Sequence, residues 1–347
     1  MGILTVLSPP GSAQATPESP ARLSVARIFS SGDFHGEHLG PIHWLPDGSA
    51  YLELESAQGE KGQQIVRHDP AGKKREIVVR AEQLIPRSAV QPLGIDDFSI
   101  GGDGREILLF TNTRRVWRLN SRGDYWVFDR DAKTLRKLGG TFPEASLLYA
   151  AFDPQGRRVA YVHENNLYVE DPGSGSIVQL TKDGGPTRTN GMFDWVYEEE
   201  LFLHGGFRFS PDGQSIAYWQ MDSSGVPQYP LLDTAAGLYP RVVPVLYPRT
   251  GQQNSAARVG VVAVSGGPTR WLELPGDPRQ NYIARMNWVP GSSELIIQRL
   301  NRRQDRLDVI RADPAKGSLH TVLSDHDDAW VDVHDDLKFF DQGRAFT

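Results

Sequence analysis

The stretch Phe209-Ser210-Pro211-Asp212-Gly213, followed by QSIAYWQMD at 214–222, decides the fold of this chain. An aromatic residue stands before a Pro-Asp-Gly turn, and a strand-like run of apolar residues follows the turn. Pro restricts the backbone at the corner, and Gly accepts the left-handed conformation that such turns need. The stretch therefore predicts two antiparallel strands that are joined by a tight turn.

The same module recurs along the chain. An aromatic residue precedes the turn in six copies, at Trp44, Phe98, Phe152, Phe209, Trp288 and Phe340. The turn glycines fall at 48, 104, 156, 213, 291 and 343, so one period near 55 holds except for one longer step. A second hairpin follows each complete copy, which gives about four strands per repeat. Four antiparallel strands at a period of about 40 to 60 residues are typical of a β-propeller blade.

We therefore predict an all-β fold, a β-propeller of about five four-stranded blades plus the start of a sixth. A set of stacked β-sandwiches is the alternative that the repeats leave open. The predicted propeller covers residues 25–347. The longer step contains a Pro- and Tyr-rich stretch at 223–256. Prolines exclude it from a central strand, so we expect an extended arm that packs on the propeller or on a partner.

Composition excludes several classes of function. The net charge is −6 and Lys and Arg are dispersed, which gives little support to nucleic-acid binding. The chain has no Cys, which rules out disulfides, thiol nucleophiles and cysteine-type zinc sites. No apolar run approaches the length of about 18 residues that a membrane-spanning helix needs.

The first 24 residues differ from the rest of the chain. A brief apolar run covers residues 3–7, and Ala13-Gln14-Ala15 has the form of a signal-peptide cleavage site. We interpret residues 1–24 as the remnant of a signal peptide and expect a periplasmic or secreted protein. A disordered N-terminal tail is the alternative.

The segment Asp194-Trp195-Val196-Tyr197-Glu198-Glu199-Glu200-Leu201 has the strongest chemical signal. Asp194 is a favourable N-cap residue for a short helix, on which Tyr197 and Leu201 lie on one face. Glu199 and Glu200 diverge by about 100°, so both can reach toward one point. Two close carboxylates repel each other, and a cation between them relieves the repulsion. The segment indicates a site for an ammonium group or a metal ion, or else a solvated acidic helix end.

Other candidates are weaker. Arg118 can present a forked donor to a carbonyl or carboxylate, or it can pair with a nearby acid. His35-Gly36-Glu37-His38 and the acidic turns at 325–328 and 334–336 are interpreted as loops, not metal sites. There is no G-x-S-x-G, H-E-x-x-H, P-loop or G-x-G-x-x-G. We therefore expect no catalytic residue, no bound metal and no cofactor in these 347 residues.

The segment DWVYEEEL at 194–201 resembles the double-glutamate motif of the dipeptidyl peptidase IV family of prolyl-oligopeptidase-like serine peptidases. Four other segments resemble that family: VWR at 116–118 with Tyr125 to Asp129, FSPDGQSIAYWQMD at 209–222, residues 247–254 with RVGVV, and QRLNRRQDRLDVI at 298–310. The resemblance covers roughly residues 25–347. The glutamate motif is highly specific, whereas the repeats alone are not.

The resemblance implies a function. In that family an eight-bladed propeller caps a C-terminal α/β-hydrolase domain, and two glutamates bind the free ammonium group of a peptide substrate. By position these are Glu199 and Glu200, and the arginine that binds a substrate carbonyl is Arg118. The resemblance implies an exopeptidase that releases N-terminal dipeptides, with an arm at 223–256 that helps to form dimers.

The chain departs from the family in one respect, because it stops within the sixth repeat. The remaining blades and the catalytic Ser, Asp and His are missing from it. We expect a fragment that is inactive alone and that needs a hydrolase domain as its partner. The alternative is a non-catalytic β-propeller that serves as a binding scaffold.

Overall fold

The computed structural model describes residues 22–347 except for 35, 37, 38, 46, 58, 60, 73 and 103. The described residues divide into two compact units, of which the first ends at Gly40 and the second runs from Pro41 to Thr347. The first contains α1 (Val25–Ser30), whose N-cap Ser24 accepts a hydrogen bond from the N–H of Arg27. The sequence predicts a propeller from residue 25, and the compact β unit starts at Pro41. The Ala13-Gln14-Ala15 segment and three of the four residues at 35–38 lie outside the described residues.

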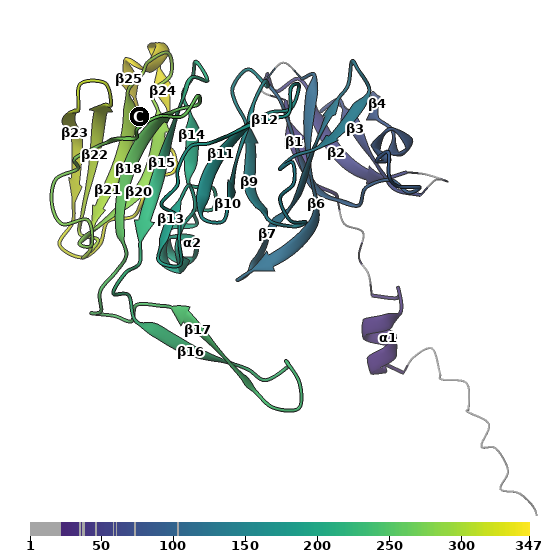
Figure 1. Ribbon diagram of the computed structural model, residues 1–347, viewed down its shortest axis with the longest axis horizontal. Helices are drawn as coiled ribbons and strands as arrows, with labels where there is room; N and C mark the ends of the chain where they lie inside the picture. Colours follow the sequence, from purple (N-terminus) through teal and green to yellow (C-terminus); the bar gives the residue numbers. More distant parts are fainter. Residues whose placement is uncertain are drawn as a thin grey trace, which may run out of the picture. The chain divides into compact units, whose positions relative to one another are not determined.

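The second unit is built from antiparallel sheets that follow one another in chain order (Figure 1). The first sheet contains β1 (Ile42–Trp44), β2 (Tyr51–Ser56), β3 (Gln63–His68) and β4 (Arg75–Val79), followed by the 3-10 helix η1 (Ala81–Leu84). The second repeat contributes β5 (Ile95–Ile100), β6 (Glu106–Val116), β7 (Leu119–Asp129) and β8 (Thr134–Lys137). The third contributes β9 (Leu147–Phe152), β10 (Val159–His163), β11 (Asn166–Asp171) and β12 (Ser176–Gln179). These two repeats are joined into one sheet because β7 pairs with β9 at Arg122–Leu148 and Gly123–Leu147.

The fourth and fifth repeats complete the described sheets. The fourth contains β13 (Arg188–Asn190), β14 (Phe207–Phe209), β15 (Ser215–Asp222), β18 (Ala256–Ala263) and β19 (Arg270–Trp271). The fifth contains β20 (Asn281–Trp288), β21 (Leu295–Asn301), β22 (Arg306–Asp313) and β23 (Ser318–His326). A final pair follows, β24 (Phe339–Phe340) and β25 (Ala345–Phe346), with the 3-10 helix η2 (Asp341–Gly343) between them. The prediction of an all-β propeller with about five blades and the start of a sixth is confirmed.

The predicted turns have the expected backbone. Gly213 has a φ of +68°, and its N–H donates to the carbonyl of Ser210 at 2.8 Å. The other five turn glycines also have positive φ. The hydrophobic core lies between successive sheets. Ile65 of the first blade, for example, packs in one cluster with Ile107 and Phe128 of the second. Each blade therefore depends on its neighbour for burial of its apolar face.

Two elements depart from the four-stranded pattern, and both lie in the fourth repeat. The helix α2 (Trp195–Leu201) stands between β13 and β14, as the sequence predicts. The hairpin of β16 (Gln228–Asp233) and β17 (Arg241–Leu246) lies between β15 and β18, which pair directly with each other. Figure 1 shows this hairpin projecting from the blade. We call residues 223–256 the arm. Among the described residues, none of the helices is long and apolar enough to cross a membrane.

Candidate functional site

The helix α2 is capped at both ends by its own sequence. The Asp194 side chain accepts a hydrogen bond from the N–H of Tyr197 at 3.0 Å, and the Ser255 hydroxyl donates to Asp194 at 2.6 Å. Phe202 adopts a left-handed conformation with φ of 54°, and its N–H donates to the carbonyl of Tyr197. The cap at Asp194 and the reversal at Phe202 limit the helix to two turns.

One face of α2 anchors it in the core, as the sequence predicts. Tyr197 is 2% exposed, stacks on Phe193 with ring centroids 5.6 Å apart, and accepts a hydrogen bond from the buried N–H of Ile283 at 3.0 Å. Leu201 is also buried. Arg285 donates to the carbonyl of Leu201 at 3.0 Å and pairs with Asp335. These contacts fix the rotation of α2 about its axis, and so they determine where the side chains of the three glutamates point.

Glu199 meets Arg118, which lies 81 residues earlier in the chain. Arg118 stands in the turn between β6 and β7, where Trp117 takes a left-handed conformation with φ of 50°. The Arg118 Nε lies 2.7 Å from one carboxylate oxygen of Glu199 and 2.6 Å from the other. The Glu199 side chain is 17% exposed, whereas that of Arg118 is 73% exposed. The terminal nitrogens of the guanidinium therefore remain accessible to a ligand.

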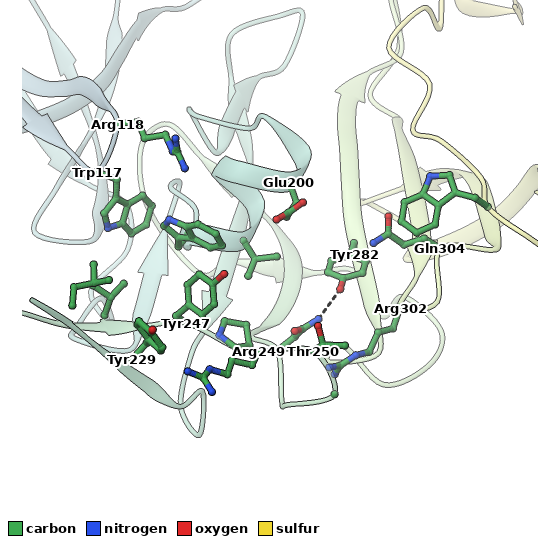
Figure 2. Close-up of a pocket in the computed structure, with 18 residues that line it drawn as sticks. Trp117, Arg118, Glu200, Tyr229, Tyr247, Arg249, Thr250, Tyr282, Arg302 and Gln304 are labelled. Atoms are coloured by element: carbon green, nitrogen blue, oxygen red, sulfur yellow. Dashed lines mark hydrogen bonds between the residues drawn. The ribbon is translucent and has the colours of Figure 1, made fainter.

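Glu200 is exposed and lines an open hollow of about 1280 Å³, which Arg118 also lines. Figure 2 shows Glu200 projecting from α2 and Arg118 entering from the β6–β7 turn, on the same hollow as Trp117 and Tyr247. The structure thus brings all three predicted site residues into one region. Arg118 and Glu200 line the hollow directly, and Glu199 joins it through its ion pair with Arg118.

Aromatic side chains form one wall of the hollow. Trp195 of α2 contacts Tyr247 at the base of the arm with centroids 4.4 Å apart, and Tyr229 lies 5.7 Å from Tyr247. The Arg249 guanidinium lies 4.9 Å from the centroid of the Tyr229 ring. The hollow therefore combines negative and positive groups with apolar surface, which is the composition of a site that binds a polar chain with apolar side chains.

The sequence analysis missed several of these lining residues. Trp117, Tyr282, Arg302, Gln304 and Trp330 come from the second, fifth and following segments of the chain. Trp117, Arg302 and Gln304 lie in segments that resemble the family, but the sequence analysis assigned them no role, and no local pattern marks Tyr282 and Trp330. All five meet only when successive blades are placed side by side. The aromatic character of Tyr229 and Tyr247 was the one indication in the sequence that the arm packs against other residues, because aromatic side chains are costly to leave in water.

Glu198 is a further acidic residue that the sequence analysis did not use. It is 8% exposed, and the Tyr149 hydroxyl donates to it at 2.7 Å. Burial raises the pKa of Glu198 to about 7, the Tyr149 hydrogen bond opposes the shift, and the charges of Glu199 and Asp194 add to it. Its only signal in the sequence is that it extends the Glu199-Glu200 pair to three consecutive glutamates.

One further group in the described part of the chain has metal-ligand composition. Ligand atoms of Glu53, Glu55 and His68 all lie within 4.8 Å of one another. They already pair with each other, because His68 Nε2 lies 2.7 Å from Glu55, and Arg75 lies 2.5 Å from the same carboxylate. The acidic segment 325–328, predicted as a turn, begins inside β23, and its Asp325 lies 3.4 Å from His334 of the second acidic segment. The first group is a set of partly buried ion pairs and hydrogen bonds, and the second is an exposed pair of the kind that is common on protein surfaces.

Comparison with known proteins gives a consistent result. Residues 102–347 match the family described as the dipeptidyl peptidase IV (DPP IV) N-terminal region. A protein named "Probable dipeptidyl-aminopeptidase B" from Pyrenophora teres f. teres is 26% identical over 363 residues, which cover 96% of this chain and 40% of that protein. Its namesake from Chaetomium globosum is 30% identical over 67% of this chain and 27% of its own length. The crystal structure of Porphyromonas gingivalis dipeptidyl peptidase 4 superposes with a TM-score of 0.80 at 28% identity, covering 92% of this chain and 45% of that one. The chain therefore spans less than half of the length of each of these relatives.

Proposed function

Because this chain belongs to the dipeptidyl peptidase IV family, matching its N-terminal region, we propose that it is the substrate-binding part of a serine exopeptidase that releases N-terminal dipeptides. In this proposal Glu199 and Glu200 bind the free ammonium group of the peptide, and Arg118 binds a carbonyl oxygen of its backbone. The observation that carries the proposal is the meeting of Arg118 with Glu199 beside the hollow that Glu200 lines.

The chemistry of the hollow suits the end of a peptide chain. The carboxylates of Glu199 and Glu200 offer acceptors to an ammonium group, and the guanidinium groups of Arg118, Arg249 and Arg302 add positive charge along the same hollow. A charge-assisted hydrogen bond from ammonium to carboxylate is about twice as strong as a neutral one. Because Glu199 engages one nitrogen of Arg118, the other nitrogens can donate to a carbonyl oxygen at the same time. An internal peptide bond has no ammonium group, so this arrangement selects the first residues of a chain.

Binding of trialanine to the 347-residue chain tests the proposal, with N-acetyl-trialanine as the matched control. We expect the free peptide to bind at least tenfold more tightly at neutral pH, since acetylation removes both the charge and its hydrogen bonds. Isothermal titration calorimetry measures both affinities. Equal affinities for the two peptides would remove the ammonium group from the interaction and with it the proposed function.

The proposed reaction also needs a serine nucleophile, which we assign to a hydrolase domain as the partner of this region. The coding sequence after Thr347 provides a direct test. A G-x-S-x-G elbow there supports the exopeptidase, whereas an unrelated or absent reading frame supports the non-catalytic scaffold.

We further propose a periplasmic or secreted location. N-terminal sequencing of the mature protein from its host tests this proposal, and we expect cleavage near residue 15.

We propose in addition that the arm mediates homodimer formation. Its exposed apolar residues are Leu231, Leu232, Leu238, Tyr239 and Val242, and Leu238 is 91% exposed. Apolar side chains that project together are typical of a surface that another chain covers. Light scattering of the wild type and of a Leu232→Asp, Leu238→Asp variant tests this proposal. A wild-type monomer at all concentrations would contradict it.

A further inference from the structure

The proposed ammonium site uses two carboxylates, but α2 carries a third one in a buried place. Glu198 is 8% exposed, and the only side-chain hydrogen bond among the described residues that reaches it comes from the Tyr149 hydroxyl at 2.7 Å. A carboxylate in such surroundings loses most of its hydration. Burial without a cationic partner is costly for the charged form, so its presence beside a binding site calls for a functional explanation.

Tyr149 is held in an unusual backbone conformation. Its φ is +57°, which is uncommon for a bulky residue. It lies at a bulge, because the register between β9 and β10 shifts between the pairs Leu148–Val162 and Ala151–Ala160. Two residues of β9 therefore stand opposite one residue of β10. Bulges and left-handed residues of this kind re-aim a side chain and concentrate near functional sites. Here the conformation directs the Tyr149 hydroxyl to Glu198.

The electrostatic surroundings of Glu198 come from two elements. Glu199 and Asp194, on α2 and its cap, both disfavour its ionisation, and Tyr149 of β9 favours the ionised form through its hydrogen bond. The positive charge of Arg118 is engaged by Glu199. Burial is the largest influence and raises the pKa of Glu198 to about 7. Its charge therefore changes within the range in which a peptide amino terminus is still protonated.

We propose that Glu198 is a positioning residue of the ammonium site: Tyr149 holds its carboxyl group beside Glu199, and ionisation of this group adds a third negative charge that tightens the binding of a peptide amino terminus. The inference rests on the proposed function. By thermodynamic reciprocity, a bound ammonium group favours the ionised form of Glu198 by the same factor.

The test compares trialanine binding to the wild type and to Glu198→Gln at about pH 5.5 and about pH 8.5. The amine of the peptide titrates equally in both experiments, so the ratio of the two dissociation constants isolates Glu198. We expect a ratio near one at the lower pH. At the higher pH we expect the wild type to bind on the order of tenfold more tightly, from one added charge at intermediate effective dielectric. A ratio that is the same at both pH values would mean that Glu198 is merely structural and would overturn the inference.

Two further variants sharpen the result. Tyr149→Phe removes the donor to the ionised carboxylate. In this variant, trialanine binding should therefore tighten at a higher pH than in the wild type. Glu164→Gln removes a carboxylate whose side chain is 81% exposed in the third blade, and its binding should follow the wild type at both pH values. A pH response in Glu164→Gln that matches Glu198→Gln would point to general surface charge and contradict the inference.

A measurement on the wild type alone guards against a variant that does not fold. Near pH 6.5 the peptide amine, with a pKa of about 8, is already protonated. Trialanine binding should then release a fraction of a proton from Glu198, which calorimetry in two buffers of different ionisation enthalpy detects. Absence of proton release would overturn the inference. If the wild type does not discriminate trialanine from its acetylated form at any pH, the proposed function fails first and this inference with it.

Discussion

At the scale of single residues, Glu198, Glu199 and Glu200 are identical in chemistry and adjacent in sequence, yet each has a different environment. Glu198 points to Tyr149, Glu199 to Arg118, and Glu200 to the open hollow. The helix separates successive side chains by about 100°, so three neighbours necessarily face three directions. Their different roles therefore follow from the rotation of α2, which Tyr197 and Leu201 determine.

Replacement of Glu200, the exposed one of the three consecutive glutamates, tests its role in peptide binding. We expect Glu200→Gln to weaken trialanine binding by about ten- to a hundredfold, because it removes one charged acceptor worth about 1.5–3 kcal/mol. Titration calorimetry at neutral pH measures the change, with Glu164→Gln as the control for net charge. An affinity within twofold of the wild type would exclude Glu200 from the site.

The stability of the protein should also report on Glu198. The pKa of this group in the folded chain is about 7, above its ordinary value of 4.5. The folded state therefore retains a proton that the unfolded state releases, and stability falls as pH rises between these values. The loss is at most about 1.4 kcal/mol per pH unit, and solvent screening reduces the total to on the order of 2 kcal/mol. Urea unfolding at several pH values should show this decline in the wild type and a smaller decline in Glu198→Gln. Parallel profiles for the two proteins would contradict the buried, protonated state of Glu198.

At the scale of elements, α2 is too short to be stable on its own, and its caps and tertiary contacts hold it. Asp194 supports the first turn and also joins the helix to Ser255, at the end of the arm. The arm in turn contributes Tyr229 and Tyr247 to the hollow. The helix and the arm thus form one structural unit, although more than twenty residues of strand and turn separate them in sequence.

The cap gives a direct prediction. Asp194→Ala should destabilise the protein by about 1–2 kcal/mol, since it removes the acceptor for the N–H of Tyr197 and for the Ser255 hydroxyl, which still contacts the hydroxyl of Ser223. Asp194→Asn keeps an acceptor oxygen and should lose less. Thermal unfolding compares both variants with the wild type. Equal losses in the two variants would mean that charge, and not the cap, stabilises α2.

Removal of the arm separates folding from binding. The strands β15 and β18 pair directly from Ser215–Ala263 to Asp222–Ala256, so the blade does not depend on the hairpin between them. Replacement of residues 228–247 by a short Gly-Ser linker should change the free energy of unfolding by no more than about 1 kcal/mol. It should weaken trialanine binding at least fivefold, because the aromatic wall is lost. A large loss of stability would show that the arm is part of the core.

At the scale of the whole molecule, binding and catalysis are predicted to be separate. The chain should bind trialanine and show no hydrolysis of Ala-Ala-p-nitroanilide, since the 347 residues contain no G-x-S-x-G nucleophile elbow. Absorbance of released nitroaniline over several hours provides the measurement. Turnover that tracks the purified chain through two chromatographic steps would contradict the assignment of the nucleophile to another domain.

Local sequence was sufficient for the features that depend on local physics. The Pro-Asp-Gly turns, the period near 55, the cap at Asp194 and the buried face of α2 each follow from residues that are close in sequence. The arm was recognised as an insertion because its prolines and tyrosines break the pattern. The expected helix site was correct in its anchoring residues, Tyr197 and Leu201, since burial of an apolar face obeys the helical period.

The assembly of the site was decided only by tertiary structure. Arg118 was a candidate from sequence without a defined partner, and the fold supplied Glu199 as that partner across 81 residues. Tyr149 had no signal at all, because its role depends on a bulge and on the packing of β9 against α2. Sequence determines which side chains are available and how each short element forms, since turns and caps involve near neighbours. Which of those side chains meet is a property of how the blades stack, since contacts between distant residues exist only once the apolar faces of neighbouring sheets are buried against each other.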